Sequence, residues 1–191
     1  MREEEKILNF LLEAFKLKDL KRTGWVNADV KNPESVADHS WGVALLALLL
    51  SEKMKLNLEK CLKMALIHDI NEIYTKDIAL QPEERGTLKE KRKREIERNA
   101  MKKILSLLPN SIKKDWEKVW NELEARKTKE AKVIRNLDKL DMAIQALIYK
   151  KRTRKDLSPW IKDANNLIEL PEIRKIFKIA EMLFKGEKNR L

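Results

Sequence analysis

Cysteine, glycine and proline are scarce in this chain, and each scarcity narrows the choice of fold. The one cysteine in 191 residues, Cys61, can form neither an internal disulfide nor a thiolate metal cage, which favours a reducing, cytoplasmic location. Four glycines and five prolines fall well short of the roughly 23 that average usage gives, which disfavours a turn-rich β-sandwich or barrel. With no convincing strand pattern, the sequence predicts an all-α fold.

Long apolar runs and a secretory leader are also missing. The longest apolar run, 43–50, is much shorter than the ~20 residues that cross a bilayer. The first residues, MREEEK, lack the basic-then-apolar order of a signal peptide. We therefore expect a soluble protein with no membrane partner. A hydrophobic share of 43% with clear periodicity argues against disorder, even though 38% of the residues are charged.

Apolar residues recur at helical spacing and predict six or seven helices in a single domain, residues 1–191, because no linker or repeat divides the chain. Ser35 and Asp38 have the spacing of a capping box, and the segment that follows, through Leu50, is hydrophobic nearly all round. This segment is expected to be a central, buried helix. Other helices are expected at about 3–18, 58–74, 83–106, 113–127, 129–151 and 171–185, the last stopped by Gly186.

Histidine occurs only twice, and both copies lie next to an aspartate in apolar helical surroundings. Imidazole nitrogen and carboxylate oxygen together suit a divalent transition metal, and two of each leave positions open for water and substrate. The sequence therefore predicts a metal site that joins three helices. Its candidate ligands are His39, His68, Asp69 and one of Asp138 or Asp141.

Asp69 and Glu72 strengthen this interpretation. Asp69 falls on the apolar face of its predicted helix, where a carboxylate is costly without a cation, and no Lys or Arg stands at 65, 66, 72 or 73. A metal is the simplest partner. Glu72 follows His68 by one turn on the same predicted face, within reach of water at the metal, and is the natural general acid or base. The plainer alternative is an exposed Glu72 that pairs with Lys76.

These motifs resemble the YfbR-like 5′-deoxynucleotidases, a branch of the HD-domain metal-dependent phosphohydrolases. The resemblance is carried by PESVADHS at 33–40, ALIHDINE at 65–72, DI at 77–78 and LDK at 137–139. It implies an HD-type helical bundle with a metal-site core at about 20–150 and C-terminal helices at 159–186 packed on it. It also implies hydrolysis of 2′-deoxynucleoside 5′-monophosphates to deoxynucleoside and phosphate, and a homodimer.

The resemblance also assigns roles to residues. Four would hold one divalent cation, cobalt or manganese ahead of nickel, iron, zinc or magnesium: His39, His68, Asp69 and Asp138. The catalytic residues would be Glu72 and Asp69. Contacts with substrate would come from Arg22 near the phosphate, Asp77 at the deoxyribose, Trp25 and Lys76. The segment KDIALQP at 76–82 departs from the Gly-Asp-Ile/Leu-x-Pro that is frequent in relatives. Two-metal branches use additional histidines, which this chain lacks.

Two other functions are weighed against this one. The net charge of +11 is concentrated at 89–103 and 150–155, as in a basic nucleic-acid-binding module. However, Glu90, Glu95 and Glu97 interrupt the first stretch as on a solvated helix face, and no nucleic-acid fold signature accompanies it. The second alternative is an HD phosphodiesterase acting on cyclic or signalling nucleotides, which the matches at Glu72 and Asp77 disfavour.

Overall fold

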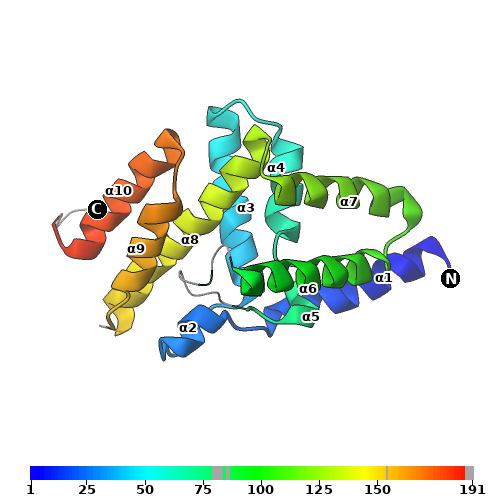
Figure 1. Ribbon diagram of the computed structural model, residues 1–191, viewed down its shortest axis with the longest axis horizontal. Coiled ribbons are helices and arrows are strands. Elements are labelled where there is room, and N and C mark those ends of the chain that lie inside the picture. The colour runs from blue at the N-terminus through cyan, green and yellow to red at the C-terminus, as the bar shows by residue number, and fades with distance from the viewer. Residues whose placement is uncertain (79–83, 85–86, 154, 188–191) are drawn as a thin grey trace.

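Helices form the regular structure of the computed structural model, which describes residues 1–78, 84, 87–153 and 155–187. Over these residues there is no strand, only an isolated bridge between Lys21 and Ser35. The predicted all-α fold class is confirmed (Figure 1). In chain order the elements are α1 (Glu3–Ala14), the 3-10 helix η1 (Phe15–Lys18), α2 (Thr23–Asn27), α3 (Val36–Lys53), α4 (Leu58–Ile67), α5 (Glu72–Thr75), α6 (Leu88–Leu105), α7 (Asn110–Ala125), α8 (Lys129–Thr153), α9 (Ser158–Leu167) and α10 (Pro171–Lys185).

Short helices raise the number of elements above the six or seven that periodicity predicts. α2 has five residues and α5 has four, too few to display a periodic apolar stripe. α9 overlaps the segment 159–186, where C-terminal helices are expected, and it begins at Ser158 and Pro159, where a proline in the first turn loses no hydrogen bond. Each of the other α-helices in the described ranges lies within or overlaps one predicted segment.

Helices α3, α4 and α8 form the centre of the molecule and pack against one another. They contribute fully buried apolar side chains that include Val43, Ala47, Met64, Leu140 and Ala143. α1, α6 and α7 lie to one side of this centre, and α9 and α10 lie to the other (Figure 1). α3 carries His39, α8 carries Asp138 and Asp141, and His68 directly follows the end of α4, so the packing of these helices determines which of these side chains meet.

Ser35 fixes where α3 begins. Its hydroxyl accepts a hydrogen bond from the Asp38 N–H at 3.1 Å, and the Asp38 carboxylate accepts one from the Ser35 N–H at 2.8 Å. The predicted capping box is therefore present, and it satisfies N–H groups that the first turn of a helix leaves unpaired. Because His39 follows directly, the box also sets the direction in which that side chain leaves the helix.

α3 is central but buried on one face only, so the prediction of a helix buried nearly all round is wrong. Trp41 is 67% exposed and Leu49 is 63% exposed, and Leu45 and Leu48 are exposed beside them. These four residues, the outer α3 face, recur at helical spacing. Hydrophobicity alone cannot distinguish an inward apolar face from an outward one. Even with this segment, no described helix combines the length and the apolar character that crossing a membrane requires.

α9 and α10 pack against α8. The buried Asn136 of α8 holds the chain just before α10, because its Oδ1 accepts hydrogen bonds from the N–H groups of Glu169 at 2.7 Å and Leu170 at 3.0 Å. α10 ends at Gly186 as predicted, with φ of 79° in the left-handed region that glycine adopts without steric cost. The C-terminal helices are thereby tied to the same helix that carries Asp138.

Candidate metal centre and substrate cavity

The two histidines reach the centre from the beginning of one helix and the end of another. His39 lies in the first turns of α3 and is 1% exposed. His68 is the C-cap of α4, and its Nδ1 lies 2.7 Å from the Ala65 carbonyl oxygen. A carbonyl oxygen only accepts, so Nδ1 carries the proton and Nε2 is left with a lone pair. The His68 Nε2 faces His39 Nε2 at 3.2 Å.

Helix α4 ends directly before His68 and Asp69, so the predicted continuous helix over 58–74 is wrong. α4 ends at Ile67, a turn follows, and α5 begins at Glu72. Tight i to i+3 bonds mark this turn: the Ile70 N–H donates to the Ile67 carbonyl and the Glu72 N–H to the Asp69 carbonyl. Asp and Asn favour such non-helical conformations because their side chains compete for the backbone. Asp69 and Glu72 therefore belong to a turn and a short second helix.

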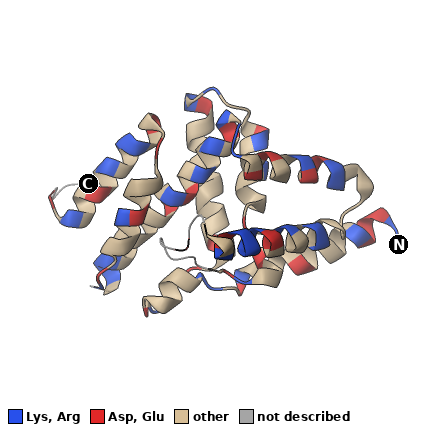
Figure 2. Ribbon diagram, in the orientation of Figure 1, with Lys and Arg blue, Asp and Glu red and all other residues tan. Residues whose placement is uncertain are grey.

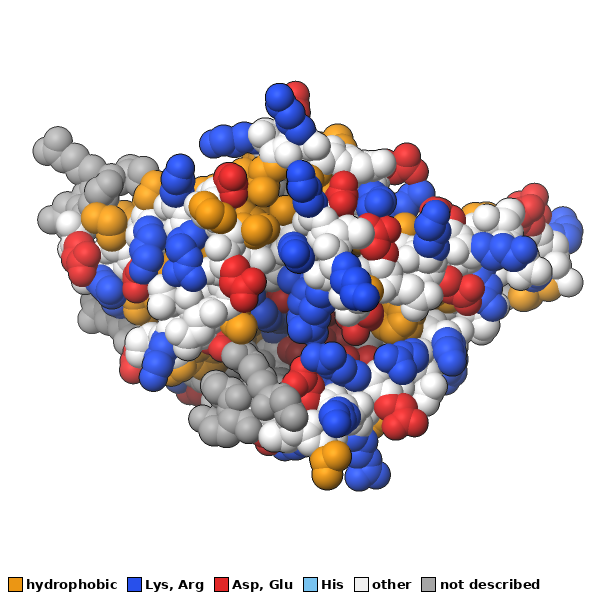
Figure 3. Space-filling view, turned by 45° about the horizontal axis from the view of Figure 1, so that its top comes forward, with side chains coloured by type: hydrophobic (Ala, Val, Ile, Leu, Met, Phe, Trp, Pro, Cys, Tyr) orange, Lys and Arg blue, Asp and Glu red, His pale blue; other side chains and the backbone are white. Residues whose placement is uncertain are grey.

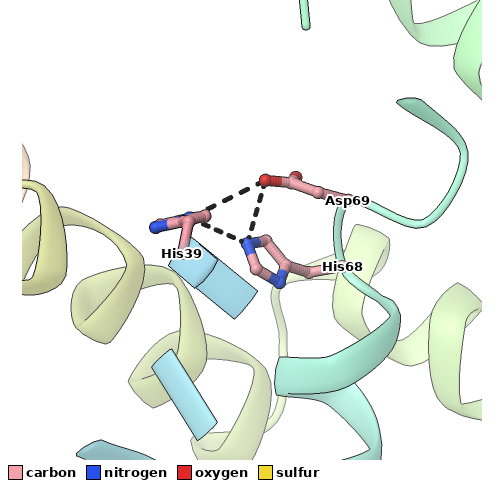
Figure 4. A group of neighbouring side chains, drawn as sticks. All are labelled: His39, His68 and Asp69. Carbon is pink, nitrogen blue, oxygen red and sulfur yellow. Dashed lines mark hydrogen bonds and ion pairs between the residues drawn. The ribbon is translucent and has the colours of Figure 1, made fainter. Parts of the chain in front are cut away.

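Four donor atoms converge where these segments meet α8. Asp69 Oδ2 lies 3.1 Å from His68 Nε2 and 3.7 Å from His39 Nε2. Figure 4 shows the three side chains pointing toward one another. Asp138 Oδ1, from α8, lies 3.3 Å from His39 Nε2. His39, His68 and Asp69 thus lie close enough together to share one ion, and Asp138 approaches this group at His39.

These donors fit a divalent cation. Ligand atoms that share one cation at roughly 2.0–2.2 Å stand about 3–3.5 Å apart, which is close to the separations of 3.1–3.7 Å among His39, His68 and Asp69 and to the 3.3 Å between His39 and Asp138. Two imidazole nitrogens and two carboxylate oxygens form a mixed donor set of the kind that transition metals take. The same atoms would otherwise leave two half-buried carboxylates in mutual repulsion, so a cation supplies the positive charge that the arrangement calls for.

The charges around His39 shift its pKa and those of its acidic neighbours. Burial and Arg22 oppose protonation of His39, but hydrogen bonds to Asp138 and Asp141 outweigh them and raise its pKa to about 9. Burial raises the pKa of Asp69, yet the two histidines outweigh burial and hold that pKa below its ordinary value. Asp138 has a lowered pKa for the same kind of reason, with Lys139 the largest of the opposing charges. The centre thus keeps its aspartates ionised and ready to bind a cation.

Glu72 lies beside these ligands, although not for the reason that helical spacing suggests. It is 6% exposed, and among the described residues its Oε2 has no hydrogen-bond partner. Burial raises its pKa well above the ordinary value, and the carboxylates of Asp69 and Asp77 add to the effect. Glu72 lines the cavity described below, and a buried carboxyl group with a raised pKa at such a place is suited to exchange a proton with water or substrate. The alternative of an exposed Glu72 does not match this burial.

Arg22 provides a positive charge that sequence spacing did not associate with Asp69. Its Nη1 is 3.8 Å from Asp69 Oδ2 and its Nε is 3.9 Å from Asp77 Oδ2. Burial lowers the pKa of Arg22, but these carboxylates outweigh burial and raise it. Asp77 is itself held in place, because its Oδ2 accepts a hydrogen bond from the Thr23 N–H at 2.7 Å. Asp69 therefore has a protein cation nearby, which the lack of Lys or Arg at 65, 66, 72 and 73 did not indicate.

A cavity of about 720 Å³ opens onto this centre. His68, Asp69, Glu72, Asp77, Arg22 and Asp138 line it, together with side chains from α6, α7, α8 and α9. On the face drawn in Figure 3, acidic side chains lie deep in a hollow that Lys and Arg side chains border. The predicted acidic residues of the site therefore share one solvent-accessible space with Arg22.

Two predicted substrate contacts lie elsewhere. Trp25 is 1% exposed and stacks on Trp160 with ring centroids 5.1 Å apart. Trp160 lines the cavity, while Trp25 and Lys76 are not among its lining residues. Lys76 is exposed and caps α5 with a positive φ of 62°. Substrate contacts by Trp25 and Lys76 stay predictions, and the changed segment 79–82 lies outside the described residues.

Nothing in the sequence around Trp160, SPWIKD, suggests that it lines a cavity. It reaches the site only because α9 folds back along α8. Asp141, left open beside Asp138 in the sequence, also contacts the centre: its Oδ2 lies 2.7 Å from His39 Nδ1. A helical wheel shows that both acids share a face of α8, but only tertiary packing shows which imidazole nitrogen each one meets.

The basic stretch on α6 forms ion pairs within its own helix. Lys93 lies 3.2 Å from Glu97, and Arg94 lies 2.5 Å from Glu90. Glu residues are interspersed among the Lys and Arg residues of this helix (Figure 2). Such a helix face is typical of a charged, solvated surface, which weakens the nucleic-acid alternative.

Comparisons with known proteins are consistent with this geometry. A family model described as an HD domain matches residues 14–174. The human protein named 5′-deoxynucleotidase HDDC2 is 39% identical over 143 residues, 75% of this chain and 68% of the human one. The Schizosaccharomyces pombe protein named 5′-deoxynucleotidase hdd1 is 34% identical over 174 residues, 88% of this chain and 85% of that one. The solved structure of a conserved hypothetical protein from Pyrococcus furiosus has a TM-score of 0.74 and 34% identity, covering 93% of this chain and 99% of that chain.

Proposed function

The chain belongs to the HD-domain family of metal-dependent phosphohydrolases, and on this premise we propose that it is a 5′-deoxynucleotidase. It hydrolyses 2′-deoxynucleoside 5′-monophosphates to a deoxynucleoside and phosphate. The relatives of that name match three quarters of the chain or more. The observation that carries the proposal is the convergence of two histidines and two aspartates beside a buried, unpartnered Glu72 and an arginine in one cavity.

His39, His68, Asp69 and Asp138 are the proposed ligands of one divalent cation, cobalt or manganese. When bound, such a cation makes water more acidic and offsets negative charge on a phosphoryl group. Support for a single metal comes from the chain having only two histidines. Asp69 has a second role, since its Oδ2 also lies near the Arg22 guanidinium at 3.8 Å and so helps to orient it.

Glu72 is the proposed general acid and base. Burial and the neighbouring carboxylates of Asp69 and Asp77 raise its pKa well above that of an ordinary glutamate, and enzymes raise the pKa of a catalytic glutamate in this way. The unpartnered Oε2 can accept the proton from the attacking water and return it to the 5′-oxygen of the leaving deoxynucleoside. Among the described residues, no group donates a hydrogen bond to this oxygen.

Arg22 and Asp77 are the proposed substrate contacts on the other side of the metal ligands. The guanidinium of Arg22 is always charged and can donate two parallel hydrogen bonds to a phosphate. Asp77, 3.9 Å from Arg22 Nε, is proposed to face the deoxyribose, where an additional 2′-hydroxyl would change the contacts of a half-buried carboxylate. Both residues line the cavity.

We also propose that the protein works as a homodimer through the outer α3 face. Trp41, Leu45, Leu48 and Leu49 place large apolar side chains in one stripe that the chain itself leaves exposed. Contiguous exposed apolar surface of this kind is frequently covered by a protein partner. A second copy of the same helix would present a self-complementary stripe, as a two-fold axis requires.

Phosphate release from chelator-stripped protein tests the proposed activity. Cobalt, manganese, magnesium or zinc is restored one at a time, and deoxynucleoside 5′-monophosphates are supplied beside a cyclic dinucleotide. Metal-dependent release from the monophosphates, lost in an Asp69→Ala variant that remains folded, is the expected result. Hydrolysis of the cyclic dinucleotide alone would favour the phosphodiesterase alternative.

A further inference from the structure

Asp141 contacts the edge of His39 that faces away from the proposed metal. Its Oδ2 is 2.7 Å from His39 Nδ1, whereas Asp138 Oδ1 is 3.3 Å from Nε2. The two aspartates are three residues apart and so share a face of α8. They therefore hold opposite edges of one imidazole ring. The His39 side chain is fully buried, so solvent does not reach the ring to replace either contact.

Because Gly42 has no side chain, the Asp141 carboxylate can occupy the space beside it. A Cβ at this position would lie 2.1 Å from Asp141 Oδ1 and 3.0 Å from its Cγ. Gly42 follows His39 by three residues, so both lie on the face of α3 that meets α8. Glycine destabilises a helix interior relative to alanine, and here a glycine is the residue that lets the carboxylate reach the ring. Two helices thus contribute to one contact.

We propose that Asp141 is a positioning residue that fixes the tautomer and the orientation of His39. A carboxylate only accepts hydrogen bonds, so the contact with Asp141 keeps a proton on Nδ1. With a cation bound in place of the proton that Nε2 otherwise shares with Asp138, Nε2 would offer its lone pair to the metal. Carboxylates in this position orient metal-binding histidines and raise their basicity. The inference rests on the proposed metal centre, and it gives Asp141 a role distinct from that of the ligand Asp138.

The surroundings of Asp141 supply a matched control. Asp141 lines a second cavity, of about 590 Å³, together with Glu34 and Gln145. Gln145 lies one turn further along the same face of α8, and substituting it changes this cavity without touching the proposed pair. Glu34, His39 and Asp141 also lie close enough to offer one ligand atom each to a cation, so the test must distinguish a positioning carboxylate from a ligand of a second ion.

The experiment compares Asp141→Asn, Gly42→Ala and Gln145→Ala with the unchanged chain. Each chelator-stripped protein is titrated with cobalt, and the cobalt absorption spectrum reports affinity and stoichiometry. Long-range proton–nitrogen spectra of the zinc-loaded, nitrogen-15-labelled proteins report which ring nitrogen is protonated, and the two histidines of the chain keep these spectra simple. Circular dichroism verifies that each variant is folded. No nucleotide is present, so the result does not depend on which phosphoester the protein hydrolyses.

We expect one cobalt per chain, with affinity about 10–100-fold weaker in Asp141→Asn and in Gly42→Ala and unchanged in Gln145→Ala. The His39 proton is expected on Nδ1 in the unchanged chain. Gly42→Ala keeps every polar group and has the higher helix propensity, so a merely structural role would leave its cobalt affinity intact. Equal cobalt affinity in all four proteins, a proton on Nε2, or loss of one of two bound ions in Asp141→Asn would overturn the proposal.

Discussion

Glu72 is proposed to transfer protons without binding the metal, so a substitution at this residue tests the two roles separately. Replacing it by glutamine keeps the size of the side chain and removes the titrating group. We expect Glu72→Gln to lower kcat by about 10²–10⁴-fold, as general acid–base catalysis typically contributes, and to leave cobalt affinity unchanged. Stopped-time phosphate assays beside cobalt titrations measure both.

Glu97 offers a matched control for this substitution. It is another acid that lines the cavity, its pKa is also raised by burial, and it pairs with Lys93. Glu97→Gln should retain most of the activity. If Glu72→Gln were as active as Glu97→Gln, the proton-transfer role of Glu72 would be wrong.

Glu34 gives a pH-dependent prediction outside the metal ligands. Burial raises its pKa, and a hydrogen bond from Trp25 Nε1 to Oε1 at 2.8 Å only partly opposes this. The folded state therefore holds this proton more tightly than the unfolded chain does. Its contribution to stability is complete below the unfolded pKa and is lost as pH rises through the raised folded value. Glutamine keeps the acceptor and does not titrate.

We therefore expect the melting temperature of Glu34→Gln, relative to the unchanged chain, to increase as pH rises from about 4 to 7. Thermal melts of both proteins in chelator at several pH values measure the difference. A difference that is constant with pH, or one that decreases, would contradict the assigned direction of the shift.

The ligand residues could be predicted from the sequence because each follows a local motif. His39 comes after a capping box, and His68 and Asp69 adjoin within one apolar segment. Arg22 is different, since it lies 47 positions before Asp69 and meets it only through the folded chain. Trp160 has no local signal at all. Short-range patterns therefore identify the ligands, while the shape and lining of the cavity depend on tertiary packing.

At the scale of elements, the start of α3 carries the greatest consequence for the site. Ser35 caps this helix and is 1% exposed. Ser35→Ala should lower the free energy of unfolding by about 1 kcal/mol, as loss of an N-cap typically does. Denaturant unfolding of this variant is compared with that of Ser106→Ala, whose hydroxyl is exposed at the end of α6. Equal stability of the two variants would show that the capping box adds nothing.

The break between α4 and α5 marks the limit of periodicity as a guide to elements. Apolar residues continue at helical spacing through Ile73, so the pattern predicts one helix. The turn over 68–71 instead ends the ladder of hydrogen bonds and directs His68 and Asp69 to the same point. Periodicity reports which side chains are buried. It does not report where a backbone changes direction between two buried residues.

At the scale of the whole molecule, the exposed apolar residues of the outer α3 face lead us to expect that two copies of the chain associate. The chain has a mass of 22.5 kDa, so a homodimer has about twice this mass. We expect Leu45→Lys combined with Leu49→Lys to yield a monomer, because two buried charges would face their own copies across the axis. Sedimentation velocity measures the change.

Leu12→Lys is the matched control, since Leu12 is 59% exposed on the apolar side of α1. It should leave the dimer intact. Dissociation by Leu12→Lys, with the α3 variant still dimeric, would place the interface on α1 instead. The single-domain organisation of residues 1–191, with a core at about 20–150, stays a prediction beside this one.

The central claim is that the cavity accepts deoxyribonucleotides at a metal-dependent phosphomonoesterase site. The most direct measurement is kcat/KM for 2′-deoxyadenosine 5′-monophosphate against adenosine 5′-monophosphate with cobalt or manganese restored. We predict a preference of at least about tenfold for the deoxy substrate, consistent with about 1–3 kcal/mol of discrimination at one group, and no turnover in chelator. Equal rates for both nucleotides, or turnover that survives complete removal of metal, would contradict the account.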